Sequence, residues 1–215
     1  MTATSRIAKE HNLTDMNESS TNTTKDAPES VNETLADWLG DIVTLESHIE
    51  EAMDRQLTLK PASQEIANAI RRFHDTVRAS KYRAQDFQKE MGEAGGNSVV
   101  KTAGELLGKA AGLVDKVRKD SVTKSLRDDY VAFNLAAISY TLLHSTALAL
   151  ADHKAAAFAE QGLTTYARMV QDINEILPQA VVEDLIKNDK VPVANSDIVE
   201  SAQQTIQTAW KTTSK

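Results

Sequence analysis

The feature that most constrains this chain is a long stretch without charge. Residues 130–151 contain no Asp, Glu, Lys or Arg, although charged residues make up 26% of the chain. Asp129 precedes the stretch and Asp152 follows it. A helix that is hydrophobic on nearly every side must be buried by its neighbours. The stretch therefore predicts either the central helix of a bundle or a membrane span.

The content of the stretch favours the bundle. Its length suits a membrane, since a span needs about 20 apolar residues. However, Asn134 and His144 interrupt it, and such side chains are costly at the centre of a bilayer. The Lys/Arg cluster and aromatic belt that would mark a span are missing from its flanks. We expect a buried bundle helix and no membrane span.

Composition and periodicity predict an all-α protein. The chain has only 8 Gly and 4 Pro, and its β-branched residues do not form alternating runs. Ser30 and Glu33 form a capping box at the start of the first helix. Apolar spacing predicts helices over residues 30–57, 62–93 and 100–117. It also predicts a helix that begins near Ser121 or Ser125, a helix that ends at Pro178, a short helix over 181–187 and a last helix that begins at Asp197.

Four of these helices are long, and a longer middle connection separates the second from the third. This pattern predicts a four-helix bundle with a crossover connection and extra short helices, the plan of ferritin-like proteins. We expect residues 1–29 to be a disordered tail, because they are polar and lack periodicity. Residues 30–188 would form the bundle, and residues 189–215 a loop and a helix that packs on it or extends from it.

Charge and cysteine content narrow the function. The formal net charge is -7, which disfavours binding to nucleic acid. The absence of cysteine excludes disulfides, thiolate zinc sites and a cysteine nucleophile. No apolar signal segment stands at the N-terminus, so we expect a cytoplasmic protein. There is also no glycine-rich phosphate loop and no G-x-S-x-G motif.

Four short motifs occur in an order and at spacings that resemble those of a known protein family. They are residues 39–46 (LGDIVTLE), 73–76 (FHDT), 111–114 (AGLV) and 126–128 (LRD). Together they resemble the bacterial YciF-like stress-protein branch of the ferritin-like superfamily, over residues 35–177. The resemblance implies a di-iron site in which two helices each supply a Glu and two others each supply Glu-x-x-His.

The chain matches this ligand set only in part. Glu46 fits the first-helix Glu, and His74 fits the second-helix His, but Arg71 stands where its Glu is expected. His144 is the only core-facing ionisable residue expected in the third helix, and Glu160 is available in the fourth. No Glu-x-x-His occurs anywhere in the chain. We therefore expect degenerate metal ligands and no cofactor.

Three functions stay open at this point. The first is a non-enzymatic ferritin-like bundle, stress-associated, structural or self-associating as a homo-oligomer, whose di-iron site is lost. The second is a di-iron or mixed-metal protein with an atypical site formed by Glu46, His74, His144 and either Glu160 or Asp75. The third is a small-molecule or lipid-binding bundle with a pocket near Ser139, Tyr140 and His144.

Overall fold

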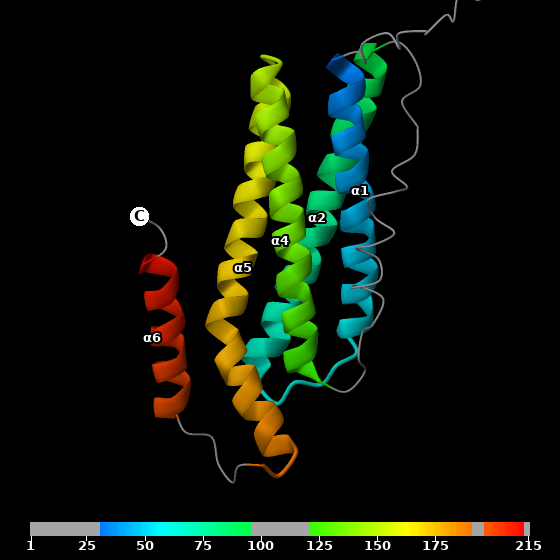
Figure 1. Ribbon diagram of the computed structural model, residues 1–215. Helices are drawn as coiled ribbons and strands as arrows, with labels where there is room; N and C mark the ends of the chain where they lie inside the picture. Colours follow the sequence, from blue (N-terminus) through cyan, green and yellow to red (C-terminus); the bar gives the residue numbers. More distant parts are fainter. Residues whose placement is uncertain (1–30, 96–120, 191–195, 213–215) are drawn as a thin grey trace, which may run out of the picture.

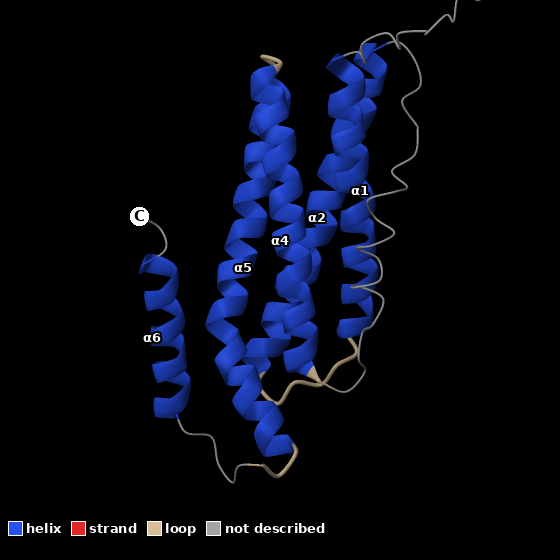
Figure 2. Ribbon diagram, viewed as in Figure 1, coloured by secondary structure: helices blue, strands red, loops and turns tan. Residues whose placement is uncertain are grey.

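The computed structural model describes residues 31–95, 121–190 and 196–212. Every element within these ranges is a helix (Figure 2). The helices are α1 (Val31–Gln56), α2 (Gln64–Gly95), α4 (Val122–Ala149), α5 (His153–Lys187) and α6 (Ser196–Thr212). The predicted all-α fold is confirmed. The predicted tail, at residues 1–29, and the predicted helix at 100–117 lie outside the described residues.

Four helices form a bundle of two hairpins. α1 pairs with α2 and α4 pairs with α5, and the hairpins meet where α1 packs on α4 and α2 on α5. α2 ends at the top of the bundle and α4 begins at the bottom, so these two consecutive helices run parallel to each other (Figure 1). This confirms the predicted crossover plan. α6 lies along the outside of α5.

The core runs the length of the bundle and draws on all four helices. Its largest fully buried side chains include Leu39 and Ile49 of α1, Phe73 of α2, Phe133 of α4 and Tyr166 of α5. α4 is long and apolar enough to cross a membrane by length and composition alone. It packs on both α1 and α5, and a core helix of a bundle passes the same test. The uncharged stretch is thus part of a bundle helix, as predicted.

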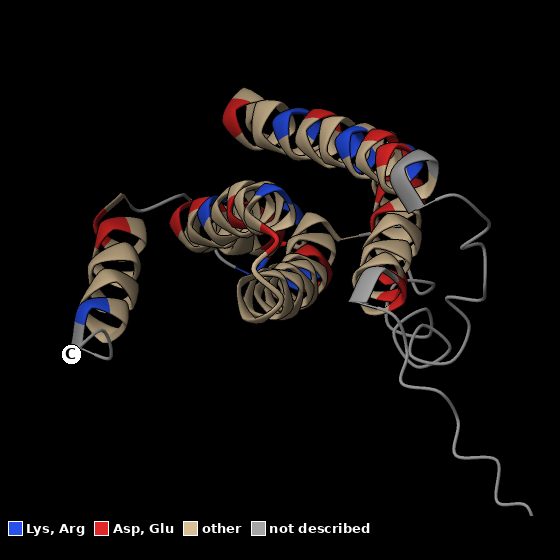
Figure 3. Cartoon of the chain, turned by 90° about the horizontal axis from the view of Figure 1, so that it is seen from above, with Lys and Arg blue, Asp and Glu red and all other residues tan. Residues whose placement is uncertain are grey.

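Charge is distributed unequally between the first two helices. Seen from above, α2 carries Lys and Arg interspersed with Asp and Glu, whereas the charged residues of α1 are mostly Asp and Glu (Figure 3). Lys81 of α2 forms an ion pair with Glu50 of α1, and Arg78 Nε lies 3.7 Å from the same carboxylate. These contacts match the acidic helix to its basic neighbour within the chain.

Polar side chains cap the helix starts. Ser121 precedes α4 and its side chain accepts a hydrogen bond from the backbone N–H of Lys124, which selects the earlier of the two predicted starts. Ser63 accepts from the N–H of Ile66 (3.2 Å) and fixes the start of α2 two residues after the predicted one. Asp152 caps α5. α6 begins at Ser196, one residue before the predicted cap.

One predicted boundary is wrong. We expected a helix to end at Pro178 and a separate short helix over residues 181–187, but α5 continues through Pro178 to Lys187. A proline inside a helix removes a hydrogen bond and costs about 3 kcal/mol. Tertiary contacts hold the last turns: Thr123 Oγ1 donates to Ala180 O (3.0 Å) and Ser121 Oγ donates to the carboxylate of Asp184 (2.7 Å). These contacts and the burial of Pro178 itself keep the helix continuous.

Candidate functional site at the bundle centre

Glu46 is a carboxylate in the middle of the core. It follows Ile42 by four residues and precedes Ile49 by three, which places it on the buried face of α1. Its exposed fraction is 0%. Buried carboxylates are rare unless they are paired, so the groups that surround Glu46 decide what this site can do.

Hydroxyl groups from three other helices surround this carboxylate. Tyr140 of α4 and Tyr166 of α5 both donate to Glu46 Oε1, at 3.0 and 2.9 Å. Ser80 Oγ of α2 lies 3.3 Å from the Tyr140 hydroxyl. Glu46 Oε2 has no hydrogen-bond partner among the described residues. Each of the four bundle helices thus contributes one side chain to a polar cluster, which we call the Glu46 cluster: Glu46, Ser80, Tyr140 and Tyr166.

Burial favours the protonated forms of the carboxyl group and of the two phenols in this cluster. It raises the pKa of Glu46, although the hydroxyls of Ser80, Tyr166 and Tyr140 and the charge of Arg83 partly offset the effect. Burial also raises the pKa values of Tyr140 and Tyr166, and the charge of Glu46 raises them further. The two phenols therefore remain hydrogen-bond donors, and the site carries at most the single negative charge of Glu46.

Aromatic packing fills the space around the cluster. The rings of Tyr140 and Tyr166 stack with their centroids 5.8 Å apart. A Cβ atom added at Gly162 would lie 2.2 Å from Cε1 of Tyr140, so the ring rests directly on the backbone of α5. Ser139 Oγ donates to Leu135 O (2.9 Å). This packing disfavours the small-molecule or lipid pocket expected beside these residues.

The other three predicted ligands lie in separate surroundings. His74 is buried, with Nε2 2.8 Å from Asp54 Oδ1 and Nδ1 3.3 Å from Asp75 Oδ1. His144 Nδ1 lies 2.9 Å from the carbonyl oxygen of Ala156. Glu160 is exposed on α5.

The described contacts join none of His74, His144 and Glu160 to Glu46. Within residues 31–95, 121–190 and 196–212, no three His, Cys, Asp or Glu side chains are grouped so that they could hold a metal.

The sequence model of one protein family, described as "Domain of unknown function (DUF892)", matches residues 30–186. The chain belongs to the DUF892 family. This family is related to the ferritin-like proteins, which confirms that part of the resemblance. The YciF-like branch and the degenerate ligands stay predictions.

A solved structure shares the fold of this DUF892 protein. It is a protein from Xanthomonas campestris pv. campestris str. ATCC 33913, with 21% sequence identity and a TM-score of 0.61, and the match covers 74% of this chain and 99% of that chain. At this identity the likeness shows the fold alone. No curated protein matches the chain.

The partners of Glu46 were not predicted from the sequence. Ser80 and Tyr166 lie on the buried faces of their helices and Tyr140 lies in the uncharged stretch, but these patterns alone do not indicate that the three side chains meet. A usable signal was present, because a buried tyrosine hydroxyl normally finds a hydrogen-bond partner. Two tyrosines on core faces, together with one core-facing carboxylate on another helix, were enough to suggest that the three groups meet.

Proposed function

We propose that this DUF892 protein is a non-enzymatic ferritin-like bundle whose centre is a structural hydrogen-bond cluster rather than a di-iron site. The observation that carries the proposal is that the hydroxyls of Tyr140 and Tyr166 both donate to Glu46 Oε1. Protein hydroxyls thus occupy one oxygen of this carboxylate, at the position where the resemblance implies a metal ligand.

The charge of the cluster supports this proposal. Ferritin-like di-iron sites use a carboxylate from each of four helices and two histidines, because several negative charges are needed to offset two cations. Here α2, α4 and α5 contribute hydroxyls at the level of Glu46. Phenols with raised pKa values do not readily supply the missing charge as phenolates.

Iron binding tests this proposal against the atypical metal site. Purified protein is incubated with Fe(II) in air and desalted, and its iron content is measured by elemental analysis. The wild type, Glu46→Gln and the exposed control Glu160→Gln should all retain the same sub-stoichiometric iron. Stoichiometric iron in the wild type that is lost in Glu46→Gln would overturn the proposal and establish the metal-binding alternative.

We infer that the protein also self-associates, with a second copy packing on α4. The outer face of α4 carries three large exposed apolar side chains at helical spacing, which are Val131, Ile138 and Leu142. The uncharged stretch extends over this face, although the chain is strongly acidic. A second copy related by a two-fold axis would bring the same uncharged face against this one, so the contact would place no like charges together.

Sedimentation velocity tests self-association over a range of concentrations. The wild type should shift from monomer to dimer as concentration rises. Leu142→Glu should remain monomeric because it places a charge in the contact, while the control Leu57→Glu, at another exposed leucine, should behave like the wild type. A wild type that stays monomeric removes this part of the proposal. The stress-associated role and the cytoplasmic location stay predictions.

A further inference from the structure

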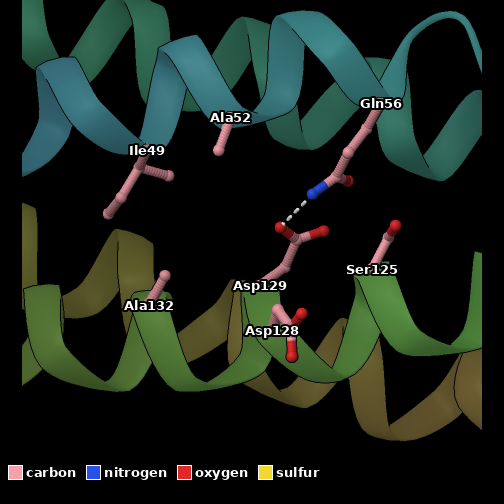
Figure 4. Close-up of a pocket in the computed structure, with 7 residues that line it drawn as sticks. All are labelled: Ile49, Ala52, Gln56, Ser125, Asp128, Asp129 and Ala132. Carbon is pink, nitrogen blue, oxygen red and sulfur yellow. Dashed lines mark hydrogen bonds between the residues drawn. The ribbon is translucent and has the colours of Figure 1, made fainter. Parts of the chain in front are cut away.

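A second polar group is buried between α1 and α4, apart from the Glu46 cluster. It lines a cavity of about 10 Å³, roughly the room that one water-sized sphere needs. The lining residues come from the last turns of α1 and the first turns of α4 (Figure 4): Ile49, Ala52, Gln56, Ser125, Asp128, Asp129 and Ala132. We call this the Asp129 cavity.

Three side chains in this cavity have incomplete hydrogen bonding. Gln56, Ser125 and Asp129 are 2%, 3% and 3% exposed. Gln56 Nε2 donates to Asp129 Oδ1 at 2.6 Å. Asp129 Oδ2, Gln56 Oε1 and Ser125 Oγ have no partner among the described residues. The three side chains face one another across the helix contact (Figure 4), so three oxygen atoms share one small space.

The carboxylate of Asp129 also lacks a compensating charge. Among the residues that the structure describes, no Lys, Arg or His lines the cavity. Asp128 lies on its lining, and Arg127 Nε donates to the Asp128 carboxylate at 2.9 Å. The pKa of Asp129 is raised to about 7: burial raises it most, the hydrogen bond from Gln56 lowers it in part, and the charge of Asp128 adds a smaller rise. An unpaired buried carboxylate is costly to ionise, and a bound cation would offset that cost.

We propose that the Asp129 cavity binds a small monovalent cation of the size of Na⁺, ligated by Asp129 Oδ2, Gln56 Oε1 and Ser125 Oγ. The oxygen ligands suit a hard cation. The charge selects a monovalent ion, because Asp129 supplies the one buried carboxylate among the described lining residues. Ca²⁺ prefers six to eight oxygen ligands and Mg²⁺ prefers octahedral geometry, for which a water-sized cavity has little room.

The position of the cavity gives the cation a role. Gln56 belongs to the last turn of α1, and Ser125 and Asp129 to the first turns of α4. An ion bound to all three would join the first hairpin to the second at the end of the bundle where α4 begins. Sodium would therefore stabilise the folded protein specifically, beyond any effect of ionic strength.

Thermal unfolding at pH 8 tests the site, with NaCl compared to choline chloride at equal ionic strength. An ion that binds only the folded state raises the folding constant by a factor of 1 + [Na⁺]/Kd, about tenfold when sodium is ten times Kd. The wild type should show this rise in NaCl alone. Asp129→Asn should lose it, Ser125→Ala should weaken it, and the exposed control Asp86→Asn should keep it.

A direct measurement of sodium binding by NMR complements thermal unfolding. It keeps the proposal testable if Asp129→Asn fails to fold. The ²³Na resonance should broaden with wild-type protein, and Ser125→Ala should broaden it less than Asp86→Asn does. Equal melting temperatures in NaCl and choline chloride would overturn the proposal. A proton on Asp129 and a water molecule would then complete the hydrogen bonding of the cavity in place of an ion. A sodium response that survives in Asp129→Asn would also overturn the proposal.

Discussion

Glu46 is the residue at which the four bundle helices meet, and its substitutions should separate hydrogen bonding from charge. Glu46→Ala leaves two buried phenol hydroxyls without an acceptor, which should lower the free energy of unfolding by about 2–5 kcal/mol. Glu46→Gln keeps an oxygen that can accept from Tyr140 and Tyr166, so we expect a much smaller loss. Urea denaturation at pH 5 measures both, with the exposed Glu160→Ala as the control.

The two Glu46 variants also differ in their pH dependence. Burial raises the pKa of Glu46 above its ordinary value of 4.5, so the folded state holds this proton more tightly than the unfolded state does. Its contribution to stability is full below about pH 4.5 and is lost as pH rises through the folded pKa. The free energy of unfolding of Glu46→Gln should therefore increase relative to that of the wild type as pH rises. A gap that is constant with pH would contradict this.

Asp184 should show the opposite pH dependence. Burial, the largest single influence, raises its pKa, but hydrogen bonds from Thr123 and Ser121 together lower the pKa below the ordinary 3.8. Its contribution is therefore present above pH 3.8 and is lost as pH falls through the folded pKa. Asp184→Asn should lose about 1 kcal/mol at pH 6, and the difference should shrink below pH 4.

Urea denaturation between pH 3 and pH 7 measures the Asp184 effect. Asp189→Asn, at an exposed residue just beyond α5, is the matched control and should follow the wild type throughout. A deficit in Asp184→Asn that persists undiminished at pH 3 would show that the carboxylate acts through packing rather than through its charge.

Single residues also show where reasoning from sequence stops. The position of Glu46 in the core was predictable, since Ile42 and Ile49 lie on the same helix face. Asp129 follows Leu126 by three residues and precedes Ala132 by three, so the same spacing places it on the buried face of α4. A charged residue at the end of an apolar stretch is more typical of a surface, and its burial depends on Gln56 of a different helix.

At the scale of elements, helix identity followed from local pattern, whereas one helix end did not. Ser121 and Asp152 are local caps, and the starts of α4 and α5 agree with their positions. Pro178 is a local helix breaker, yet α5 continues through it. The turns beyond Pro178 contact the start of α4 and the start of α2, where the Ser63 N–H donates to Glu183 at 3.0 Å. A rule based on neighbouring residues cannot predict such contacts between distant segments.

The contact between α4 and α5 gives a prediction in which two effects compete. In a helix interior, Gly→Ala normally adds up to about 1 kcal/mol of stability. At Gly162 the new Cβ would lie 2.2 Å from the ring of Tyr140, which Tyr166 and Glu46 hold in place. Overpacking of this kind costs about 1–3 kcal/mol, so Gly162→Ala should lower the melting temperature.

Gly92→Ala is the matched control, because nothing lies within 4 Å of a Cβ added there. It lies in α2 and should raise the melting temperature slightly through helix propensity. Circular dichroism melts of both variants decide the sign. A stabilised Gly162→Ala would show that the Tyr140 ring can move away from α5 at little cost.

At the scale of the whole molecule, the four-helix bundle forms the core and α6 packs on its outside. The match to the DUF892 family ends at residue 186, before α6 begins. α6 contacts α5 along one side, where Gln203 Nε2 donates to the carbonyl oxygen of Glu175 at 2.7 Å. Ile198 and Trp210 of α6 remain 58% and 41% exposed. Little apolar surface is therefore buried between α6 and the bundle.

A chain that ends at Lys190 should accordingly keep a cooperative fold. We expect its melting temperature to fall by only a few degrees, because its four-helix core keeps every contact of the Glu46 cluster and of the Asp129 cavity. A chain that ends at Gln179 is the matched control. It also removes Glu183 and Asp184, which bind the starts of α2 and α4, and should lose far more stability. Loss of cooperative unfolding in the chain that ends at Lys190, measured by calorimetry, would mean that α6 is an integral part of the bundle.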